Sequence, residues 1–401
     1  MKKATHQQTK EHNRNLVLRT IFERDPISRA EIARITGLTR ATVSDIVAEL
    51  LNEGLVSEIG VGESIGGKAP ILLSLEKDSR YLIGLYLAED QFIGSIINLR
   101  GEIKDTIEIP ILNRSGEQAL RCVYDLLDLL TTKAYQPIVG IGIATPGLVN
   151  TKEGIVINAV NLDWKDLALS QMLQEHYHIP VSVLNDSQAA AIGEFVYGGN
   201  HPPESNLIVI NIKYGIGAGV LINGCLFQGD GGGAGEIGHV VVEENGSLCR
   251  CGKKGCLETV ASAKAILQRT LALLPEYPHS TLSSYKGNLS LENLAAAWQN
   301  QDPLATLVVS EAIHYLGIAI ANLVSVLNIH EIVITGDITR LGDIWLAQVY
   351  EAMQKSALAK LAQDTHLEFG KLGFKSFTLG ASAYMLLGDY HPLFMQSQLG
   401  A

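Results

Sequence analysis

Residues 235–256 read GEIGHVVVEENGSLCRCGKKGC and hold three of the five cysteines in the chain. Four soft ligands in this stretch follow the spacing H-x9-C-x-C-x4-C: His239, Cys249, Cys251 and Cys256. One imidazole and three thiolates suit a tetrahedral Zn²⁺ ion, and Gly252 and Gly255 would let the backbone turn tightly around it. Three buried cysteines in a turn are the alternative, which the clustering disfavours. Because four protein ligands close the coordination sphere, we expect a structural zinc ion.

The composition on either side of this stretch describes an ordered, globular chain of two or three domains. Its 401 residues are 47% hydrophobic and 18% charged. No apolar stretch follows the polar N-terminus and no run of 18 or more apolar residues occurs, so we expect neither a signal peptide nor membrane insertion. Cys122 and Cys225 stand alone, which fits a reducing cytoplasm better than a disulfide framework.

Charge is distributed unevenly along the chain. The net charge of −11 argues by itself against binding to nucleic acid. Residues 1–44, however, carry nine Lys and Arg against four Asp and Glu, whereas residues 71–401 carry 21 against 33. A basic head on an acidic body is typical of a protein in which one module contacts DNA. By charge alone, an ordinary basic tail would look the same.

The N-terminal segment predicts three helices. Apolar residues recur at helical spacing before Pro26, which ends the first helix. The pattern Ser28-x-x-Glu31 is a capping box that opens a short second helix. Gly37 supplies a tight turn, and Thr39 caps a longer third helix. Two helices joined by a turn that contains glycine form a helix-turn-helix. The weaker alternative is a three-helix module used only for contacts with other proteins.

The third helix would be the recognition helix, whose N-terminal residues reach base edges in the major groove. Short side chains and one arginine occupy these positions: Thr39, Arg40, Ala41, Thr42 and Ser44. Arg40 can pair with guanine, and Ala41 can meet a thymine methyl group. The glycine-rich run 60–68 reads as a hairpin tip before a strand at 71–73. The module is therefore predicted to be a winged helix-turn-helix in which Lys68 meets the phosphate backbone.

Beyond residue 78, strands alternate with helices, which indicates an α/β body. The strongest strand signals are the apolar runs 81–87, 92–99, 138–144, 181–184, 207–212, 219–222 and 331–335. The first two are joined as a hairpin, and a helical stretch at 187–197 follows Asn185-Asp186. Two α/β halves with a cleft between them place ligands at the C-terminal ends of the strands.

The stretch from Gly235 to Cys256 resembles the signature of the ROK family, named for repressors, open reading frames and sugar kinases. Residues 28–44 resemble the DNA-binding segment of ROK repressors, and residues 80–395 resemble the family's actin-like, sugar-kinase fold. The resemblance implies three parts: a winged helix-turn-helix (1–78), a first lobe (79–200, to which a C-terminal helix, 380–395, returns) and a second lobe with the zinc motif (201–379).

The resemblance also implies a sugar site. Six residues match the family's sugar-contacting positions: Gly147, Asn185, Asp186, Glu236, His239 and Glu258. In the kinases, the aspartate at the position of Asp186 accepts the proton of the attacking sugar hydroxyl, and the preceding asparagine bonds a neighbouring hydroxyl. Carboxylates, an amide and an imidazole suit a polyol, because each hydroxyl both donates and accepts. Taken alone, Asn-Asp after a strand is more often a turn or a helix cap.

Two of these residues carry a further expectation. Gly147 would let the backbone approach the sugar ring closely, as the family's Pro-Gly turn does. His239 would bind zinc through one ring nitrogen and the sugar through the other, so that sugar occupancy reaches the metal loop. A purely structural knuckle that holds Glu258 in place is the alternative for His239.

The family's nucleotide elements are altered in this chain. YLAED at 86–90 stands where the kinases carry D-x-G-x-T, so Tyr86 replaces the metal-binding carboxylate and Asp90 opposes phosphate. KY at 213–214 replaces a Gly-Thr pair, and TGD at 335–337 replaces a double glycine. GIGAG at 215–219 survives, but a lone GxGxG is a weak signal that a hairpin turn also produces. These changes predict that the chain is not an enzyme.

Together these features predict a cytoplasmic, sugar-responsive transcriptional repressor of carbohydrate-utilisation genes, similar to ROK repressors of the xylose, glucose or N-acetylglucosamine type. Operator double-stranded DNA and a sugar or sugar-phosphate effector are the expected partners, and Zn²⁺ is the expected cofactor. A homodimer or higher oligomer is expected because paired half-sites need paired recognition helices. The competing hypotheses are a ROK sugar kinase with an appended DNA-binding domain and, more weakly, a scaffold that binds another protein.

Overall fold

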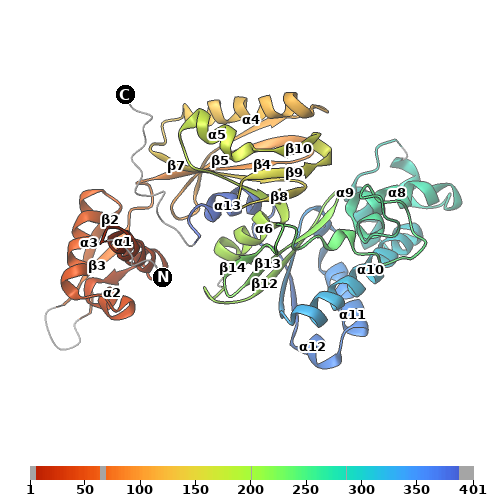
Figure 1. The fold of residues 1–401 in the computed structure, drawn as a ribbon. Helices are drawn as coiled ribbons and strands as arrows, with labels where there is room; N and C mark the ends of the chain where they lie inside the picture. Colours follow the sequence, from red (N-terminus) through yellow and green to blue (C-terminus); the bar gives the residue numbers. More distant parts are fainter. Residues whose placement is uncertain (1–5, 64–68, 200, 286, 388–401) are drawn as a thin grey trace.

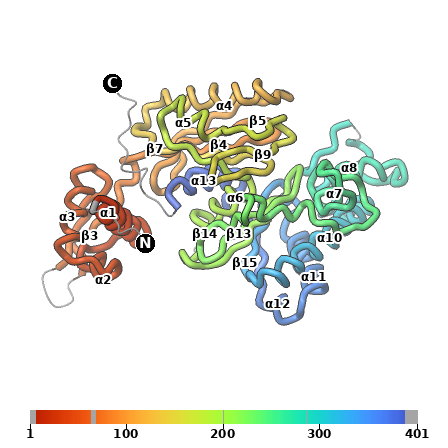
Figure 2. The backbone as a smooth tube through the Cα atoms, in the orientation of Figure 1, coloured from red at the N-terminus to blue at the C-terminus, as the bar shows by residue number. Residues whose placement is uncertain are grey.

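The computed structural model describes residues 6–63, 69–199, 201–285 and 287–387. A small N-terminal head stands beside two larger lobes, and the second lobe ends in a group of helices far from the head (Figure 1). The backbone trace follows the same division (Figure 2). This is the predicted arrangement of a winged helix-turn-helix followed by a two-lobed α/β body.

The head is a winged helix-turn-helix. It contains α1 (His6–Glu23), β1 (Ile27–Ser28), α2 (Arg29–Thr36), α3 (Arg40–Asn52), β2 (Val56–Val61) and β3 (Ile71–Leu75). Ser28 Oγ accepts a hydrogen bond from Glu31 N at 3.3 Å, which is one of the two bonds of the predicted capping box, whereas the Glu31 carboxylate pairs with Arg34. Gly37 ends that helix with φ = 71°. The antiparallel pair β2–β3 forms the wing, and Lys68 lies outside the described residues.

The first lobe is a five-stranded sheet covered by helices. Its elements are β4 (Tyr81–Leu87), β5 (Gln91–Asn98), β6 (Ile103–Pro110), α4 (Gly116–Thr131), β7 (Ile138–Thr145), β8 (Leu148–Asn150), β9 (Ile155–Ala159), β10 (Trp164–Leu167), α5 (Leu169–Tyr177), β11 (Val181–Asn185) and α6 (Asp186–Gly193). The strand order is β11-β7-β4-β5-β6, with β11, β7 and β4 parallel. Strands β4 and β7 are buried along their whole length, as expected where both faces of a sheet are covered.

The second lobe repeats this plan. Its elements are β12 (Leu207–Ile212), β13 (Ile216–Ile222), β14 (Cys225–Phe227), α7 (Glu258–Ala261), α8 (Ala263–Leu273), α9 (Leu291–Gln299), α10 (Pro303–Leu327), β15 (Glu331–Thr335), α11 (Gly342–Ser356), α12 (Ala359–Asp364) and β16 (His366–Phe369). The strand order β14-β13-β12-β15-β16 has the same pattern as the first sheet. The parallel strands β12 and β15 therefore end at the same edge, where the cleft opens.

Two helices lie between the sheets. α13 (Lys375–Tyr384) packs on β4 and β7 and against α6, which in turn packs on β12 and β13 (Figure 1). α13 begins before residue 380, where the C-terminal helix was expected to start, and residues 388–395 of that expectation lie outside the described residues. The chain thus crosses back from the second lobe to the first through α13.

The long helix α10 forms the centre of the second lobe's hydrophobic core. It has the length and hydropathy of a membrane-spanning helix, and 61% of its most apolar window is buried inside the protein. A buried core helix satisfies the same criterion, and Leu304, Ile313 and Ile320 of α10 join the second lobe's main cluster of buried residues. Burial within the lobe accounts for the apolar composition of this helix.

The head and the first lobe share one hydrophobic cluster. Leu82 of β4, Leu99 after β5 and Met385 after α13 belong to the same cluster as the buried residues of α1 and α3. A polar contact completes this joint, because Arg100 donates hydrogen bonds to the carbonyl of Phe22 and to the Asp25 carboxylate. The head is therefore packed on the body and is not merely tethered to it.

Candidate functional site

A cleft of about 520 Å³ opens between the two lobes at the C-terminal ends of the central strands. Its lining includes all six residues that the resemblance assigned to a sugar: Gly147, Asn185, Asp186, Glu236, His239 and Glu258. They come from the turn between β7 and β8, from β11, α6 and α7, and from the segment that follows β14. Residues separated by more than a hundred positions in the sequence thus meet in one cavity.

Asn185 and Gly147 build the floor of this cleft. The side-chain oxygen Oδ1 of Asn185 accepts from the N–H groups of Ser187 and Gln188, so Asn185 caps α6, as the alternative interpretation held. Its amide nitrogen donates to the Gly147 carbonyl at 2.9 Å. Gly147 has φ = 91°, and a Cβ there would clash with the Asn158 carbonyl. The glycine is therefore required by the close approach of β9, a reason that the sequence does not reveal.

Asp186 is the first residue of α6 and faces the cleft. Its carboxylate accepts a hydrogen bond from its neighbour Ser187 N at 2.8 Å. Burial raises the pKa of Asp186, while the nearby Lys213 ammonium group and the Ser187 hydrogen bonds oppose that rise. The carboxyl group thus lines the cleft beside Lys213.

Glu236, His239 and Glu258 form the opposite wall of the cleft. His239 Nε2 lies 3.7 Å from Glu236 Oε2, on the side that lines the cavity. Glu258 Oε2 accepts a hydrogen bond from Ile216 N at 3.3 Å. Burial raises the pKa of Glu236, and His239 partly opposes that rise. Two carboxylates and one ring nitrogen therefore face the same space as Asp186.

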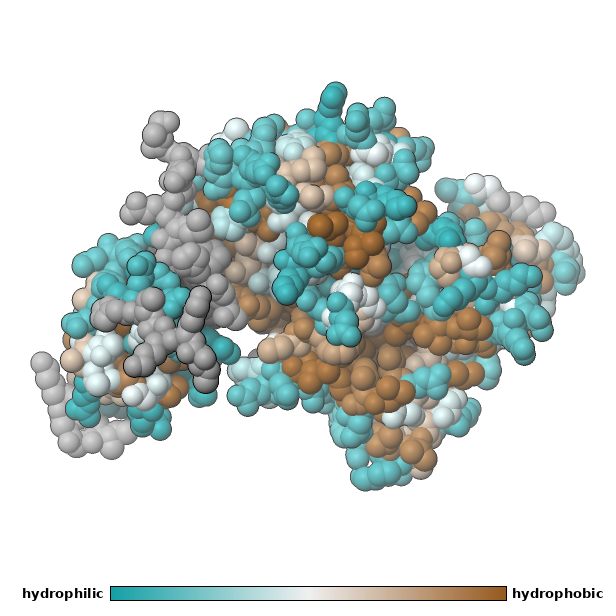
Figure 3. Space-filling view, in the orientation of Figure 1, coloured by the Kyte–Doolittle hydropathy of each residue, from teal (hydrophilic) through white to brown (hydrophobic). Residues whose placement is uncertain are grey.

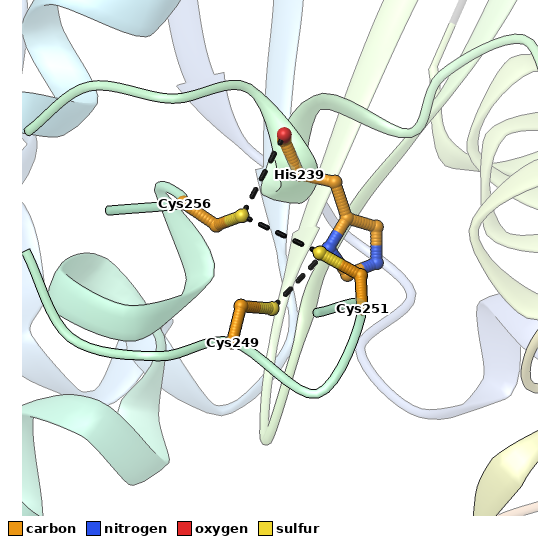
Figure 4. Close-up of side chains that lie close together, drawn as sticks. All are labelled: His239, Cys249, Cys251 and Cys256. Carbon is orange, nitrogen blue, oxygen red and sulfur yellow. Dashed lines mark hydrogen bonds between the residues drawn. The ribbon is translucent and has the colours of Figure 1, made fainter. Parts of the chain in front are cut away.

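The other face of His239 belongs to the cysteine cluster. The four ligand atoms lie within 4.8 Å of one another, and Figure 4 shows the imidazole and the thiols converging: His239, Cys249, Cys251 and Cys256. His239 Nδ1 lies 3.5 Å from Cys249 Sγ, and Cys251 Sγ lies 3.6 Å from Cys256 Sγ. Nδ1 of His239 thus lies beside the cysteine cluster, and Nε2 lies beside Glu236 in the cleft.

The two shortest of these distances, His239 Nδ1 to Cys249 Sγ and Cys251 Sγ to Cys256 Sγ, match those around one tetrahedral ion, and the whole set spans up to 4.8 Å. Bonds of about 2.3 Å to sulfur and about 2.0 Å to nitrogen place two sulfurs about 3.8 Å apart and a sulfur and a nitrogen about 3.5 Å apart. Gly252 and Gly255 have φ of 88° and 72°, so the predicted turns of the cysteine loop are present. The donor set and its geometry are compatible with a metal ion held by four protein ligands.

The GIGAG run at 215–219 has a structural explanation. Gly217 and Gly219 lie within β13, opposite Asn211 and Val209 of β12, and not in a phosphate-binding loop. A Cβ at Gly217 would clash with the Ser187 hydroxyl, and one at Gly219 with Ala191. Both glycines therefore allow α6 to approach the sheet closely.

A lysine occupies the end of β12 where the kinases have small residues. Lys213 Nζ lies 2.5 Å from the Tyr86 hydroxyl and within 4.8–5.2 Å of the ring centres of Tyr86, Phe374 and Phe377. Tyr86 and Phe377 are stacked, with centroids 4.1 Å apart. Burial lowers the pKa of Lys213, and the carboxylates of Asp337 and Asp186 oppose that decrease.

The predicted DNA-contacting residues begin α3 on the surface of the head. Exposed side chains occupy four of the five positions: Thr39, Arg40, Ala41 and Ser44. Thr42 is half-buried, and its backbone N–H donates to Thr39 Oγ1 at 3.2 Å. The first turn of this helix is thus both capped and accessible, as a recognition helix requires.

Sequence reasoning missed Arg250, which stands between two of the cysteines. Its guanidinium group donates to Asn161 Oδ1 of the first lobe and lies 3.9 Å from Glu258 Oε1. The cysteine loop therefore reaches across the mouth of the cleft. The sequence placed Arg250 in the loop that holds the cysteines but gave no sign of its contact with Asn161, because Asn161 is 89 residues away in the sequence.

Comparison with known families assigns both parts of the chain. The ROK family matches residues 82–387, and the winged helix-turn-helix DNA-binding family matches residues 11–57. The xylose repressor of Caldicellulosiruptor bescii is 31% identical over 393 residues, which cover 96% of this chain and 98% of that protein. A glucokinase of Halalkalibacterium halodurans is 33% identical over 309 residues, which cover 75% of this chain and 93% of the enzyme.

A solved structure gives the same assignment. The crystal structure of a ROK family transcriptional regulator, a homologue of the E. coli MLC protein, matches with a TM-score of 0.86 at 29% identity. The match covers 96% of this chain and 98% of the regulator, so it includes the head and both lobes. This chain belongs to the ROK family and joins a winged helix-turn-helix module to the family's actin-like body.

Proposed function

We propose that this chain is a transcriptional repressor whose operator binding responds to a sugar held in the cleft between the lobes. One observation carries the proposal: a single chain presents an exposed recognition helix and a cleft lined by carboxylate, amide and imidazole groups suited to a polyol. Matches to repressors over the whole chain, head included, support the proposal. Such a protein acts in the cytoplasm, where its operator DNA is.

Sugar kinase activity is the second candidate, because Asp186 is in place and a glucokinase is among the relatives. The altered nucleotide elements argue against it. Lys213 and its aromatic neighbours fill the end of β12, and Asp337 replaces the second glycine of the adenosine loop. A bound nucleotide would meet the Asp337 carboxylate at the position where, in the kinases, it lies against the glycine backbone. We therefore propose that the cleft senses its ligand without phosphoryl transfer.

We also propose that the metal of the cysteine cluster is a zinc ion with a structural role. Three thiolates and one imidazole are the ligands zinc prefers, and four protein ligands leave no open position for substrate. When bound, the ion would fix the loop that carries His239 and Arg250. The chain's own residues then act on the ligand: His239 Nε2 and Glu236 face the cleft while Nδ1 holds the loop.

A homodimer or higher oligomer is the proposed assembly. Exposed apolar side chains lie on helices α10 and α11 of the second lobe and just before α12, at Leu307, Val326, Ile344 and Leu358. In the face drawn in Figure 3, hydrophobic residues gather over the second lobe, whereas the head is largely hydrophilic. Apolar surface of this kind is what an oligomer would bury, and paired recognition helices would read paired half-sites.

One experiment tests the proposal as a whole. Full-length protein is used to select duplexes from a random DNA pool, and the selected operator is then titrated with monosaccharides while fluorescence anisotropy reports binding. We expect a specific operator and at least one sugar that changes its affinity. A coupled ATP hydrolysis assay runs in parallel with the same sugars. Sugar-dependent hydrolysis would favour the kinase hypothesis, and failure to select any duplex would contradict the repressor.

A further inference from the structure

The charge of the cleft bears on which carbohydrate it accepts. Four carboxylates are among its described lining residues: Glu89, Asp186, Glu236 and Glu258. The cationic side chains among the same residues are Lys213 and Arg250, and His239 adds an imidazole. An uncharged sugar needs acceptors such as these carboxylates, whereas a phosphate ester needs cations or free N–H donors.

Both cations are already engaged within the protein. Arg250 bonds Asn161 and lies 3.9 Å from Glu258 Oε1. Lys213 donates to the Tyr86 hydroxyl and lies over three aromatic rings. These three rings, Tyr86, Phe374 and Phe377, form an aromatic cage around the ammonium group, and the stacking of Tyr86 on Phe377 holds the cage in place. To bind a phosphate, Lys213 would have to leave this cage.

More acidic groups surround Lys213 than one ammonium group can neutralise. The carboxylates of Asp337, Asp186, Asp90 and Glu89 all act on its charge. The helix terminus beside it is no alternative anion site, because Asn185 accepts from the N–H groups of both Ser187 and Gln188 at the start of α6. A dianionic phosphate at this end of the cleft would therefore meet net negative charge.

We propose that the effector of this chain is an uncharged monosaccharide and that the cleft rejects the corresponding phosphate esters. The carboxylates of the cleft outnumber its cations, and both cations are already paired within the protein. The inference rests on the proposed sugar response and narrows it to one class of ligand. The sugar hydroxyls form hydrogen bonds with Asp186, Glu236 and Glu258. Lys213 closes the end of the cleft at the C-terminal ends of β4 and β12, and its ammonium group does not contact the ligand.

Calorimetric titration of the full-length protein tests this inference with matched pairs of ligands. The neutral sugars are D-glucose and N-acetyl-D-glucosamine, with their 6-phosphates as partners, and D-xylose is added as a neutral pentose. We expect at least one neutral sugar to bind, and a phosphate ester to bind at least about 30-fold more weakly than its parent or not at all. Should a 6-phosphate bind as tightly as its parent sugar or more tightly, the inference is wrong.

A double variant tests the cause of the discrimination. Glu89→Gln with Asp337→Asn removes two charges near Lys213 and touches none of the proposed sugar contacts. The affinity for a phosphate ester should rise by about 3- to 10-fold, while the affinity for the neutral sugar changes by less than about twofold. Glu204→Gln with Asp343→Asn removes the same net charge from exposed positions of the second lobe and should change neither affinity. If the affinity for the phosphate ester rises equally in both double variants, the carboxylates near Lys213 are not the cause of the discrimination.

The outcomes separate this inference from the proposed function. Tight binding of a phosphate ester that also releases the operator overturns the neutral class and leaves a sugar-responsive repressor standing. If no sugar of either class binds while the operator is still bound, the sugar response itself is wrong, and this inference falls with it.

Discussion

Among single residues, Asp186 distinguishes sensing from catalysis most sharply. Asp186→Asn keeps the shape and one acceptor oxygen but removes the charge. We expect effector binding to weaken by about 1.5–3 kcal/mol, the usual loss for a hydrogen bond to a charged group, and operator affinity without effector to stay unchanged. Calorimetry and operator anisotropy measure the two quantities, with the exposed Asp166→Asn as control. If the wild type hydrolyses ATP in response to sugar and Asp186→Asn abolishes this, the kinase hypothesis prevails.

The cysteine cluster makes a second prediction about single residues. Cys251→Ala should lose the metal, and elemental analysis should find one zinc per wild-type chain and less than one in the variant. The variant should also be less stable and respond less to effector, because His239 and Arg250 share the loop. Cys225→Ala is the matched control, since Cys225 is also exposed but lies outside the cluster. Wild-type metal content and response in Cys251→Ala would contradict the zinc proposal.

The sequence predicted these ligands and not their surroundings. His239 and the cysteines lie within 18 positions, so local spacing was enough to find them. The Lys213 cage could not be found in this way, because Tyr86, Phe374 and Phe377 come from strand and helix ends far apart in the chain. The sequence showed only that Lys213 replaced a small residue of the kinases. That change indicates the loss of nucleotide binding but does not reveal that Lys213 contacts aromatic rings.

At the scale of secondary-structure elements, α3 carries the prediction for DNA. Arg40→Ala should relax or abolish operator discrimination, with a loss of about 1–3 kcal/mol for one bidentate base contact. The measurement is anisotropy on the selected operator and on a scrambled duplex at several salt concentrations. Lys360→Ala on α12 is the control, as an exposed cation far from the head. An equal loss on both duplexes would show that Arg40 contacts phosphate and not a base.

The N-terminus of α10 gives a prediction that depends on pH. Asp302 caps this helix and accepts hydrogen bonds from the N–H groups of Leu304, Ala305 and Thr281. Burial opposes its ionisation, but the hydrogen bonds prevail and hold its pKa below the ordinary value of 3.8. The stabilisation is therefore present above pH 3.8 and is lost as the pH falls through the lower folded value.

Asp302→Asn tests this cap, because one carboxylate oxygen becomes an NH2 group that cannot accept the hydrogen bonds made to it, such as the one from Thr281 N. We expect the free energy of unfolding to fall by about 1–3 kcal/mol at pH 7 and the gap from wild type to shrink near pH 3. Thermal unfolding at the two pH values measures both effects. Asp343→Asn, in the first turn of α11 but without a side-chain cap, should change stability little. A gap that is the same at both pH values would exclude ionisation as its cause.

Helix starts were more predictable than helix ends. Ser28 and Thr39 cap the helices that the sequence assigned to them, because a cap is a local hydrogen bond. The helical stretch predicted at 187–197 is present, but its α-helical part ends at Gly193 and a π-helical turn, Glu194–Gly198, completes it. There the buried Glu194 carboxylate accepts hydrogen bonds from the backbone of Lys371 and Leu372, a tertiary contact that no local pattern reveals.

At the scale of the whole molecule, we expect the joint between head and first lobe to carry the signal from the cleft to the operator. Arg100→Met removes the hydrogen bonds to Asp25 and Phe22 and keeps the aliphatic stem. We expect each ligand alone to bind within about threefold of wild type, but the effector to change operator affinity less. Lys133→Met, a first-lobe cation paired with Asp105, is the control. An unchanged effector response would place the coupling elsewhere.

The shared cluster of this joint also limits how such proteins can be recombined. Leu82, Leu99 and Met385 of the body are buried in one hydrophobic cluster with residues of the head. A chimaera that takes its head from a relative and is joined near residue 78 would replace one half of a packed core and keep the other, with cavities or overpacking as the result. Heads and bodies should therefore be inherited as matched pairs. A descendant that lost its head would have to exchange these positions for polar residues before it could be a soluble protein.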